Sequence, residues 1–461
     1  MFNKEVYTKR RNKLQTMLSS GVVLILGNNE VSYNYPDNTY RWRQDSNFSY
    51  FFGLNLQGLA GIIDIDNNEH IIFGTELTVD DIVWMGSQPT LKENAAKAGI
   101  NITREYSTLQ TYLNEAVNKG RKIHFLPPYR GEHYLELEKL LGINYCAVNR
   151  YVSKELVKAV ISLREIKEDV EIEEIEKAVL TAYDMHTTAM KMAKTGVYEY
   201  EIAGTIEGIA LKHNNFISFP VILSINGQTL HNHSHSNLLK EGRMLVVDAG
   251  AETELLYASD ITRSIPVGGK FNSRQKDIYE AVLAANMKGI ENIRIGQNNV
   301  DNHIAAVTTL LEHLKELKMV KGNVHDAVMN GAGGFFMPHG LGHQMGMDVH
   351  DMEGLGENLV GYDKNLERST IPGIRSLRMG KKLKKGHVFT VEPGCYFIPE
   401  LFNQWKSQGM CTEFINYDVV EKYLDFGGIR IEDDVLVTDD KARVLGKPIP
   451  KTVKEIENIC D

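Results

Sequence analysis

The sequence has little cysteine and no long apolar run. Its four cysteines, Cys146, Cys395, Cys411 and Cys460, lie far apart and form no CxxC pair. This usage predicts buried free thiols in a reducing compartment rather than a disulfide framework. No apolar stretch approaches the roughly 18–20 residues that a membrane-spanning helix needs, and the N-terminal stretch lacks the apolar core of a secretory signal. These absences predict a cytoplasmic protein with no membrane partner.

No concentrated charge of one sign is present either. The 461 residues have a net charge of −9, with 24% charged and 43% hydrophobic residues. Binding nucleic acid requires concentrated Lys and Arg to neutralise phosphates. The local basic cluster at 381–385 is better explained as a solvated turn before a strand. The composition therefore predicts a soluble globular protein without a nucleic-acid partner.

The length predicts two or three domains. In the first part of the chain, two short apolar runs alternate with two helical stretches, at 22–26, 61–64, 7–17 and 109–117. From 167 to 194, apolar residues recur at the three-four spacing of one helix face, and Gly196 is placed to cap that helix. We expect an α/β (α+β) protein with an N-terminal α/β domain over residues 1–160 and a second domain over 161–461.

The second part contains apolar runs that are typical of buried strands, and acidic residues lie at or near their ends. The runs are 244–248, 261–266, 388–392 and 429–435. The associated acids are Asp248, Asp260, Glu392 and Glu432. In the last run Arg430 and Glu432 are two residues apart and share a face of the strand, so Arg430 can support Glu432 or a neighbouring anion.

Each of these acids alone is explained well as a turn residue, a strand terminator or an ion-pair partner. Together they would be partly buried charges with few Lys or Arg residues nearby in the sequence, and buried charge needs a partner. Two divalent ions would neutralise four carboxylates. Oxygen-rich ligands favour Mn²⁺ or Mg²⁺ over a thiolate type of zinc site, and two ions about 3.5–4 Å apart are used in metal-assisted hydrolysis.

Two groups of histidines accompany the acids. The first alternates along the chain, at His231, His233 and His235, and a solvated strand or loop explains it better than a metal cluster. The second has glycines between its members, which are His339, His343 and His350. That glycine density favours an irregular loop whose backbone approaches a ligand closely. One histidine of the second group is expected to bind metal, and spacing alone does not identify it.

In this order and local context, the motifs resemble those of the Xaa-Pro metallopeptidases of the pita-bread fold, the group of prolidase and aminopeptidase P. The resemblance covers nearly the whole chain, including RQDSNF at 43–48, which is similar to a segment of that group's N-terminal domain. It implies a dinuclear site, with Mn²⁺ as the expected metal and Mg²⁺, Co²⁺ or Zn²⁺ as alternatives. The implied ligands are Asp248, Asp260, His343, Glu392 and Glu432.

The resemblance also implies catalytic and substrate-binding roles. His231 and His350 resemble the histidines that face the substrate, and His339 resembles the histidine beside the proline site. Arg430 resembles an arginine that hydrogen-bonds close to the metal carboxylates. Glu392, besides binding metal, resembles the residue that accepts the proton of the attacking water.

The segment PGIRSLR at 372–378 is similar to prolidase in particular. It implies that Arg378 binds the free carboxylate of proline in a dipeptide, with Arg375 as the competing choice. Extra residues at 357–363 separate this segment from the histidine loop. The stretch from His231 to Asp248 is nearer in length to that of aminopeptidase P.

The implied function is therefore prolidase, which cleaves small Xaa-Pro peptides, and the alternative is aminopeptidase P. A metal-free binding module and a creatinase-like hydrolase share the fold but lack the metals. Retention of all the ligands disfavours both. The resemblance further implies a homodimer in which the N-terminal domain covers the cleft of the partner subunit.

Overall fold

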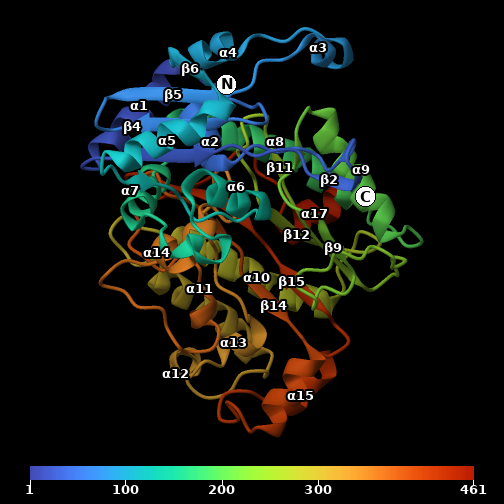
Figure 1. Cartoon of the computed structure of the whole chain (residues 1–461). Helices are drawn as coiled ribbons and strands as arrows, with labels where there is room; N and C mark the ends of the chain where they lie inside the picture. Colours follow the sequence, from blue (N-terminus) through green and yellow to red (C-terminus); the bar gives the residue numbers. More distant parts are fainter. Residues whose placement is uncertain (461) are drawn as a thin grey trace. The chain divides into compact units, whose positions relative to one another are not determined.

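The computed structural model describes residues 1–460, which form two compact units, Met1–Arg164 and a second unit that begins at Glu165 (Figure 1). Helices and strands alternate in both, which confirms the mixed α/β class. Residue 160, the predicted boundary, lies within helix α7 (Lys154–Arg164), and this helix belongs wholly to the first unit. None of the described helices is both long and apolar enough to span a bilayer.

The first unit is built on a five-stranded sheet in the order β6-β5-β4-β1-β7. Its strands are β1 (Val22–Leu26), β4 (Ala60–Asp64), β5 (Glu69–Gly74), β6 (Ile102–Glu105) and β7 (Ile123–His124), and a separate hairpin contains β2 (Ser32–Tyr35) and β3 (Asn38–Thr39). The helices are α1 (Lys4–Thr16), α2 (Ser46–Phe52), α3 (Val79–Met85), α4 (Leu91–Lys97), α5 (Leu109–Asn118), α6 (Gly131–Leu141) and α7, with short 3₁₀ turns η1 (Tyr106–Thr108) and η2 (Tyr145–Arg150).

The core of the first unit forms between the sheet and two helices. Alternate residues of β1, such as Val22 and Leu24, pack with Leu109 and Leu113 of α5 and with residues of α6. The strands β1 and β4 are antiparallel and in register, with Val22 opposite Asp64. The 43–48 segment starts α2, because the side chain of Asp45 accepts a hydrogen bond from the backbone N–H of Phe48.

The second unit contains short antiparallel sheets covered by long helices. The strands are β8 (Phe216–Ile217), β9 (Ile222–Ser224), β10 (Met244–Ala249), β11 (Ala251–Glu252), β12 (Ile261–Pro266), β13 (Val388–Val391), β14 (Gly394–Tyr396), β15 (Gly428–Arg430), β16 (Asp433–Val437) and β17 (Ala442–Val444). The main helices are α8 (Asp169–Met192), α9 (Glu199–Lys212), α10 (Ser273–Glu291) and α11 (Asn299–Glu316). Shorter ones are α12 (Val324–Met329), α13 (Gly333–Phe336), η3 (Glu353–Leu355), α14 (Glu357–Gly361), η4 (Ile374–Ser376), α15 (Pro399–Ser407), α16 (Tyr417–Val420), η5 (Glu421–Tyr423) and α17 (Val453–Cys460).

Strand pairing in the second unit brings distant parts of the chain together. The order β12-β10-β9 makes β10 the central strand of one sheet, and β13-β16-β17 makes β16 central in another. All six residues of β10 are buried, as its apolar sequence predicts. Helix α8 contacts β10 and β12, and α10 contacts β13, β14 and β15. Figure 1 labels α10 beside β14 and β15. The helices thus cover the faces of these sheets, and the ends of the strands remain available to form the site.

Two predicted elements differ in the structure. The run 429–435 is two strands, β15 and β16, because the chain changes partner: β15 pairs with β14 and β16 pairs with β13. At the break, Ile431 donates its N–H to the carbonyl of Pro393, and Glu432 donates to that of Thr262. Helix α8 ends at Met192 with Ala193 as its C-cap, three residues before Gly196, so the predicted glycine cap is wrong.

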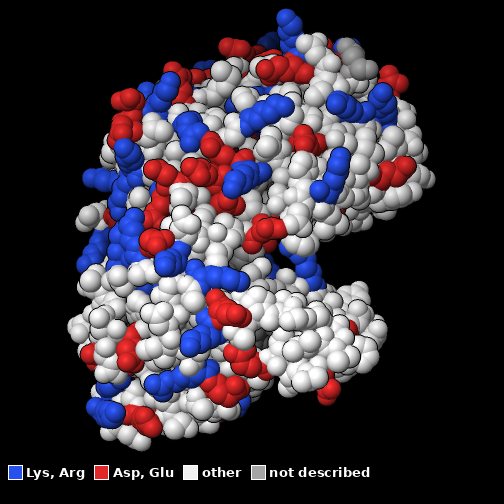
Figure 2. Space-filling model, turned by 90° about the horizontal axis from the view of Figure 1, so that it is seen from above, with Lys and Arg blue, Asp and Glu red and all other residues white. Residues whose placement is uncertain are grey.

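The surface matches the even charge spread of the sequence. Figure 2 shows basic and acidic side chains interspersed on the face it presents, with neither sign covering it. This distribution agrees with the small net charge of −9.

Candidate metal centre

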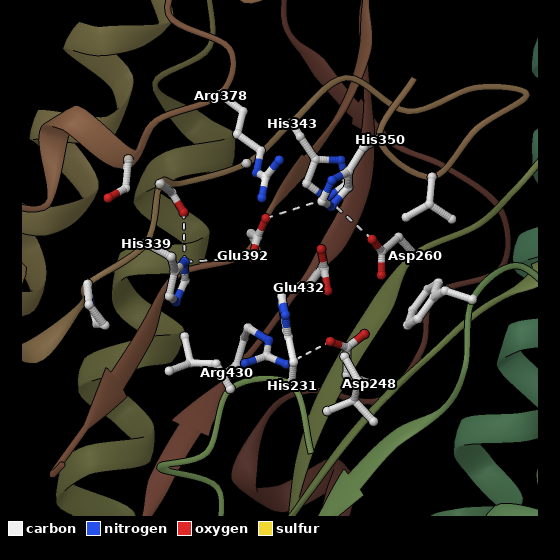
Figure 3. Close-up of a pocket in the computed structure, with 18 of the residues that line it drawn as sticks. His231, Asp248, Asp260, His339, His343, His350, Arg378, Glu392, Arg430 and Glu432 are labelled. Atoms are coloured by element: carbon white, nitrogen blue, oxygen red, sulfur yellow. Dashed lines mark hydrogen bonds and ion pairs between the residues drawn. The ribbon is translucent and has the colours of Figure 1, made fainter. Parts of the chain in front are cut away.

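A cavity of about 470 Å³ lies in the second unit. Every residue predicted for the site lines it: His231, Asp248, Asp260, His339, His343, His350, Arg378, Glu392, Arg430 and Glu432 (Figure 3). Apolar side chains, including Phe219, Ile222 and Val349, complete the wall. Arg375, the alternative to Arg378, is exposed and is not one of the lining residues.

The carboxylates reach the cavity from strand ends that pairing brings together. Asp248 is the fifth residue of β10 and lies opposite Thr262 of β12, and Asp260 directly precedes β12. Glu392 follows β13, and Glu432 occupies the break before β16. Because β13 and β16 are neighbours, Glu392 and Glu432 lie at the same end of their sheet. The sequence predicted strand ends correctly for Asp248, Asp260 and Glu392, but it placed Glu432 inside the single run 429–435, which the structure divides at that residue. The antiparallel pairing supplies the convergence of the four acids.

His343 comes from an irregular loop that follows α13 and lies beside β13. The N–H of His343 donates to the hydroxyl of Thr390, and the N–H of Thr390 donates to the carbonyl of His343. A Cβ added to Gly340 would lie 2.6 Å from the Cα of Leu377, and one added to Gly342 would collide with the carbonyl of Thr390. The glycines therefore allow the loop to approach neighbouring backbone, whereas we expected a close approach to a ligand.

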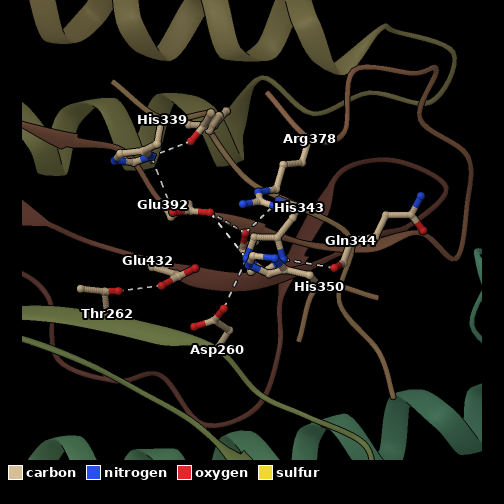
Figure 4. Close-up of polar contacts among 12 residues, drawn as sticks. Asp260, Thr262, His339, His343, Gln344, His350, Arg378, Glu392 and Glu432 are labelled. Carbon is tan, nitrogen blue, oxygen red and sulfur yellow. Dashed lines mark hydrogen bonds and ion pairs between the residues drawn. The ribbon is translucent and has the colours of Figure 1, made fainter. Parts of the chain in front are cut away.

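The imidazole of His343 faces the carboxylates. Its Nε2 lies 3.3 Å from Oδ2 of Asp260 and 3.6 Å from Oε1 of Glu392. One ligand atom each of Asp260, His343 and Glu432 lie within 4.8 Å of one another. Figure 4 shows Asp260, His343, Glu392 and Glu432 around a common space. These distances bring four side chains from four separate segments within reach of shared cations.

The clustered carboxylates are unfavourable as anions in the metal-free protein. Burial, together with the charge of Asp248, raises the pKa of Asp260 well above its ordinary value. Burial and the charges of Asp260 and Glu392 do the same for the pKa of Glu432. Burial raises the pKa of Glu392 to about 7. Buried anions that repel one another are stabilised by cations placed between them.

Arg430 neutralises one carboxylate of the group. Its buried guanidinium donates to Oδ2 of Asp248 over 2.6 Å and to the hydroxyl of Tyr396 over 2.9 Å. We expected Arg430 to support Glu432 or another anion of the site, and its carboxylate partner is Asp248. The second oxygen of Asp248, Oδ1, is buried and has no hydrogen-bond partner among the described residues. That orphaned oxygen is available to a cation.

The donor set fits divalent metal ions on a further ground. Nδ1 of His343 lies 3.1 Å from the carbonyl of Gln344, which can only accept, so Nδ1 carries a proton. Burial lowers the pKa of His343, so the ring is neutral and Nε2 presents a lone pair. That lone pair faces carboxylate oxygens of Asp260 and Glu392, an arrangement that is repulsive unless a proton or a metal cation lies between the atoms. Four carboxylates and one imidazole nitrogen form a hard, oxygen-rich ligand set.

Three further histidines lie around this centre. The ring of His350 packs beside that of His343, with centroids 4.0 Å apart, and the proximity of His343, together with burial, lowers the pKa of His350 to about 3. Nδ1 of His339 lies 3.7 Å from Glu392, and burial lowers the pKa of His339 to about 3. Partial burial also lowers the pKa of His231, which lies in the wall beside Arg430 (Figure 3). All three favour the neutral form at neutral pH.

Sequence reasoning missed two polar residues of the site. Thr262 donates to Glu432 over 2.6 Å (Figure 4) and accepts from Nε of Arg430 over 3.1 Å. The hydroxyl of Tyr396 lies 2.9 Å from Nε2 of His339 and accepts from Arg430. The available signal was position: Thr262 lies two residues after Asp260, and Tyr396 ends the EPGCY motif that contains Glu392.

Comparison with known proteins agrees with this geometry. Residues 173–439 match the model of metallopeptidase family M24, and residues 7–124 match that of the aminopeptidase P N-terminal domain. The chain is 31% identical over 472 residues to Xaa-Pro dipeptidase of Homo sapiens, covering 99% of this chain and 92% of that protein. It is 27% identical over 458 residues to a probable Xaa-Pro aminopeptidase of Uncinocarpus reesii, covering 95% and 90% of the two chains.

Among solved structures, aminopeptidase P from E. coli with the inhibitor Pro-Leu superposes with a TM-score of 0.81 at 25% identity. The match covers 100% of this chain and 98% of that structure. The expected pita-bread architecture with an aminopeptidase P type of N-terminal domain is thereby confirmed. With its M24 match extending over more than half of its length, the chain belongs to metallopeptidase family M24.

Proposed function

We propose that this chain hydrolyses the Xaa-Pro bond of Xaa-Pro dipeptides, as a prolidase that uses two divalent metal ions, with Mn²⁺ as the expected metal. The proposal rests on the placement of Arg378 in the wall of the cavity that contains the candidate ligands. The 31% identity of the chain to Xaa-Pro dipeptidase of Homo sapiens adds support. The ligands proposed for the two ions are Asp248, Asp260, His343, Glu392 and Glu432.

Bound there, the two ions would supply charge stabilisation and lower the pKa of water toward neutrality. Glu392, at the edge of the carboxylate group, is placed to accept the proton of the attacking water and to pass it to the proline nitrogen. His231 is placed to donate a hydrogen bond to the scissile carbonyl as its oxygen gains charge, and His350 faces the substrate in the same cavity. His339 lies beside Glu392 on the side proposed for the proline ring.

The leaving group has to be recognised through atoms other than those of the bond that breaks. The proline nitrogen of an Xaa-Pro bond has no N–H to donate, so specificity depends on the shape of the ring and on the terminal carboxylate. Arg378 is half-buried, and its guanidinium points into the cavity beside Glu392 (Figure 3). An arginine at this position can receive the carboxylate of a dipeptide through two parallel hydrogen bonds.

Arg378→Ala tests this assignment. Hydrogen bonds to charged groups contribute roughly 1.5–3 kcal/mol, so we expect turnover of Ala-Pro to fall about 10- to 100-fold. Turnover of Ala-Pro-Ala should fall much less, because the carboxylate of this peptide lies one residue further on. Initial rates of the Mn²⁺-loaded protein on both peptides make the comparison. Arg375→Ala is the matched control, because it removes an exposed arginine of the same segment. Equal losses on both peptides would remove Arg378 from carboxylate binding.

Aminopeptidase P activity is the second candidate function. It is favoured by the structural match to aminopeptidase P of E. coli over the whole chain and by the likeness to a probable Xaa-Pro aminopeptidase. Faster cleavage of Ala-Pro-Ala than of Ala-Pro by the wild-type protein would favour this alternative. A metal-free binding role is disfavoured because every proposed ligand is present and lines the cavity.

We further propose that the protein is a cytoplasmic homodimer. Both assignments come from the sequence and its resemblance. Light scattering coupled to size-exclusion chromatography tests the dimer, and a monomer at micromolar concentration would contradict it.

A further inference from the structure

The connection between the histidine loop and the PGIRSLR segment, which contains the extra residues 357–363, folds onto Arg378. It includes η3 (Glu353–Leu355) and α14 (Glu357–Gly361). The N–H of Gly380 donates to the carbonyl of Gly361 over 2.8 Å, and the hydroxyl of Tyr362 donates to that of Leu377 over 2.7 Å. A Cβ on Gly361 would collide with the carbonyl of Arg378. The backbone on both sides of the arginine is therefore held by this connection.

The same connection also contacts the arginine side chain. One carboxylate oxygen of Glu353, Oε1, forms an ion pair with NH1 of Arg378. Glu357 lies farther from the same nitrogen, at 3.7 Å, and is itself paired with Arg368. Glu353 is thus the principal partner of the guanidinium in the protein without substrate.

The second oxygen of Glu353 binds a different substrate-facing group. Oε2 lies 2.7 Å from Nδ1 of His350. Since a carboxylate only accepts, this bond requires a proton on Nδ1, and in the neutral ring Nε2 remains for other partners. The side chains of His350, Glu353 and Arg378 are 35%, 28% and 37% exposed. One carboxylate at the rim of the cavity therefore joins two groups on which substrate recognition depends.

Only a carboxylate accepts from both partners at once. His350 and Arg378 each direct an N–H donor at Glu353, and a carboxylate has two acceptor oxygens. A glutamine has one acceptor oxygen and a donor NH₂, so it can accept from only one of the two groups, and it would keep a bond to each only if the proton of His350 moved from Nδ1 to Nε2.

We propose that Glu353 is a specificity-determining residue that positions Arg378 for the terminal carboxylate of a dipeptide while it holds the ring of His350. The proposal rests on the proposed prolidase function. It assigns the connection that contains Glu353 and the extra residues 357–363 to the recognition of short substrates. Glu353 itself acts through its two partners and does not touch the reacting atoms.

A double-mutant cycle tests this assignment. Contacting residues couple measurably, so we expect E353Q to lower kcat/KM for Ala-Pro about 3- to 10-fold more than for Ala-Pro-Ala, mainly through a higher KM. In an R378A background, E353Q should affect the two peptides equally, because the arginine that it positions is gone. E353D retains both acceptor oxygens and should restore part of the dipeptide preference.

E367Q is the matched control, because Glu367 is exposed in the same connection and its replacement removes the same charge. It should leave both rates unchanged. Equal effects of E353Q on the two peptides, or an undiminished difference in the R378A background, would overturn the positioning role. A lower KM for Ala-Pro in E353Q would also overturn it, since Glu353 would then compete with the substrate. Failure of the wild-type protein to cleave either peptide is a distinct result, which rejects the proposed function and this role with it.

Discussion

At the scale of single residues, the centre depends on side chains that hold the proposed ligands without binding metal. Thr262 is fully buried and connects Glu432 to Arg430, and Arg430 in turn holds Asp248. This chain of hydrogen bonds fixes two carboxylates that come from different sheets. Such supporting partners typically change metal affinity 10- to 100-fold when they are removed.

Thr262→Val tests that dependence. The replacement keeps the shape of the side chain but removes the hydroxyl, so Glu432 loses a donor and Arg430 an acceptor. We expect the apparent affinity for Mn²⁺ to fall about 10- to 100-fold, as measured by competition with a chelating dye. Thr262→Ser retains the hydroxyl and should bind Mn²⁺ nearly as the wild type does. An unchanged affinity in the valine variant would show that the hydroxyl does not support the ligand.

At the scale of elements, the loop with His343 and His350 is held by a buried ion pair. Nζ of Lys167, which precedes α8, lies 2.8 Å from Oδ2 of Asp351, and both side chains are 1% exposed. The N–H of Asp351 donates to the carbonyl of Gln344 and so closes the loop on itself. The start of the second unit is thereby joined to the loop that presents the histidines.

Lys167→Met should destabilise this unit strongly. Removing one partner of a buried pair leaves an uncompensated charge, which typically costs 3–5 kcal/mol. Urea unfolding of the metal-free protein measures the loss. Lys240→Met, which removes an exposed lysine of the same unit, is the control and should cost about 0.5 kcal/mol or less. Similar losses in the two variants would contradict a special role for the buried pair.

The local sequence pattern was sufficient to predict an element where one face of that element is continuously apolar. The strands β1 and β10 and the long helix α8 follow from runs and periodicity, and β10 is wholly buried as expected. The break between β15 and β16 could not be predicted, because the apolar alternation continues through Ile431 while the change occurs in the pairing partner. Likewise, the contact of Glu353 with Arg378 joins positions 25 residues apart, and no local periodicity encodes it.

At the scale of the whole molecule, the candidate chemistry lies in the unit that begins at Glu165, and the first unit has its own buried polar centre. Asp64, at the end of β4, is buried and accepts hydrogen bonds from Tyr112 and the backbone of Asn67, and it forms an ion pair with Arg121. Burial by itself would raise the pKa of Asp64. The bonds from Arg121, Tyr112 and Asn67 outweigh that effect and lower it below 3.8.

This shift predicts a pH dependence of stability. Because the pKa of Asp64 is lowered in the folded state, its carboxylate stabilises the fold above about pH 3.8, and the stabilisation is lost as the pH falls through the lowered value. Asp64→Asn should cost roughly 1.5–3 kcal/mol at pH 7, and the difference from wild type should shrink below about pH 4. Urea unfolding of both proteins at pH 7 and below about pH 4 checks this. An equal difference in unfolding free energy at the two pH values would show that the charge of Asp64 does not stabilise the fold.

The whole proposal depends on two ions held by Asp248, Asp260, His343, Glu392 and Glu432. The most direct measurement is a titration of the chelated protein with Mn²⁺ while hydrolysis of Ala-Pro is followed. We expect no hydrolysis without metal, and a rate that rises until two ions are bound per chain. Hydrolysis that does not depend on added Mn²⁺, or no hydrolysis at saturation, would contradict a metal-dependent Xaa-Pro dipeptidase.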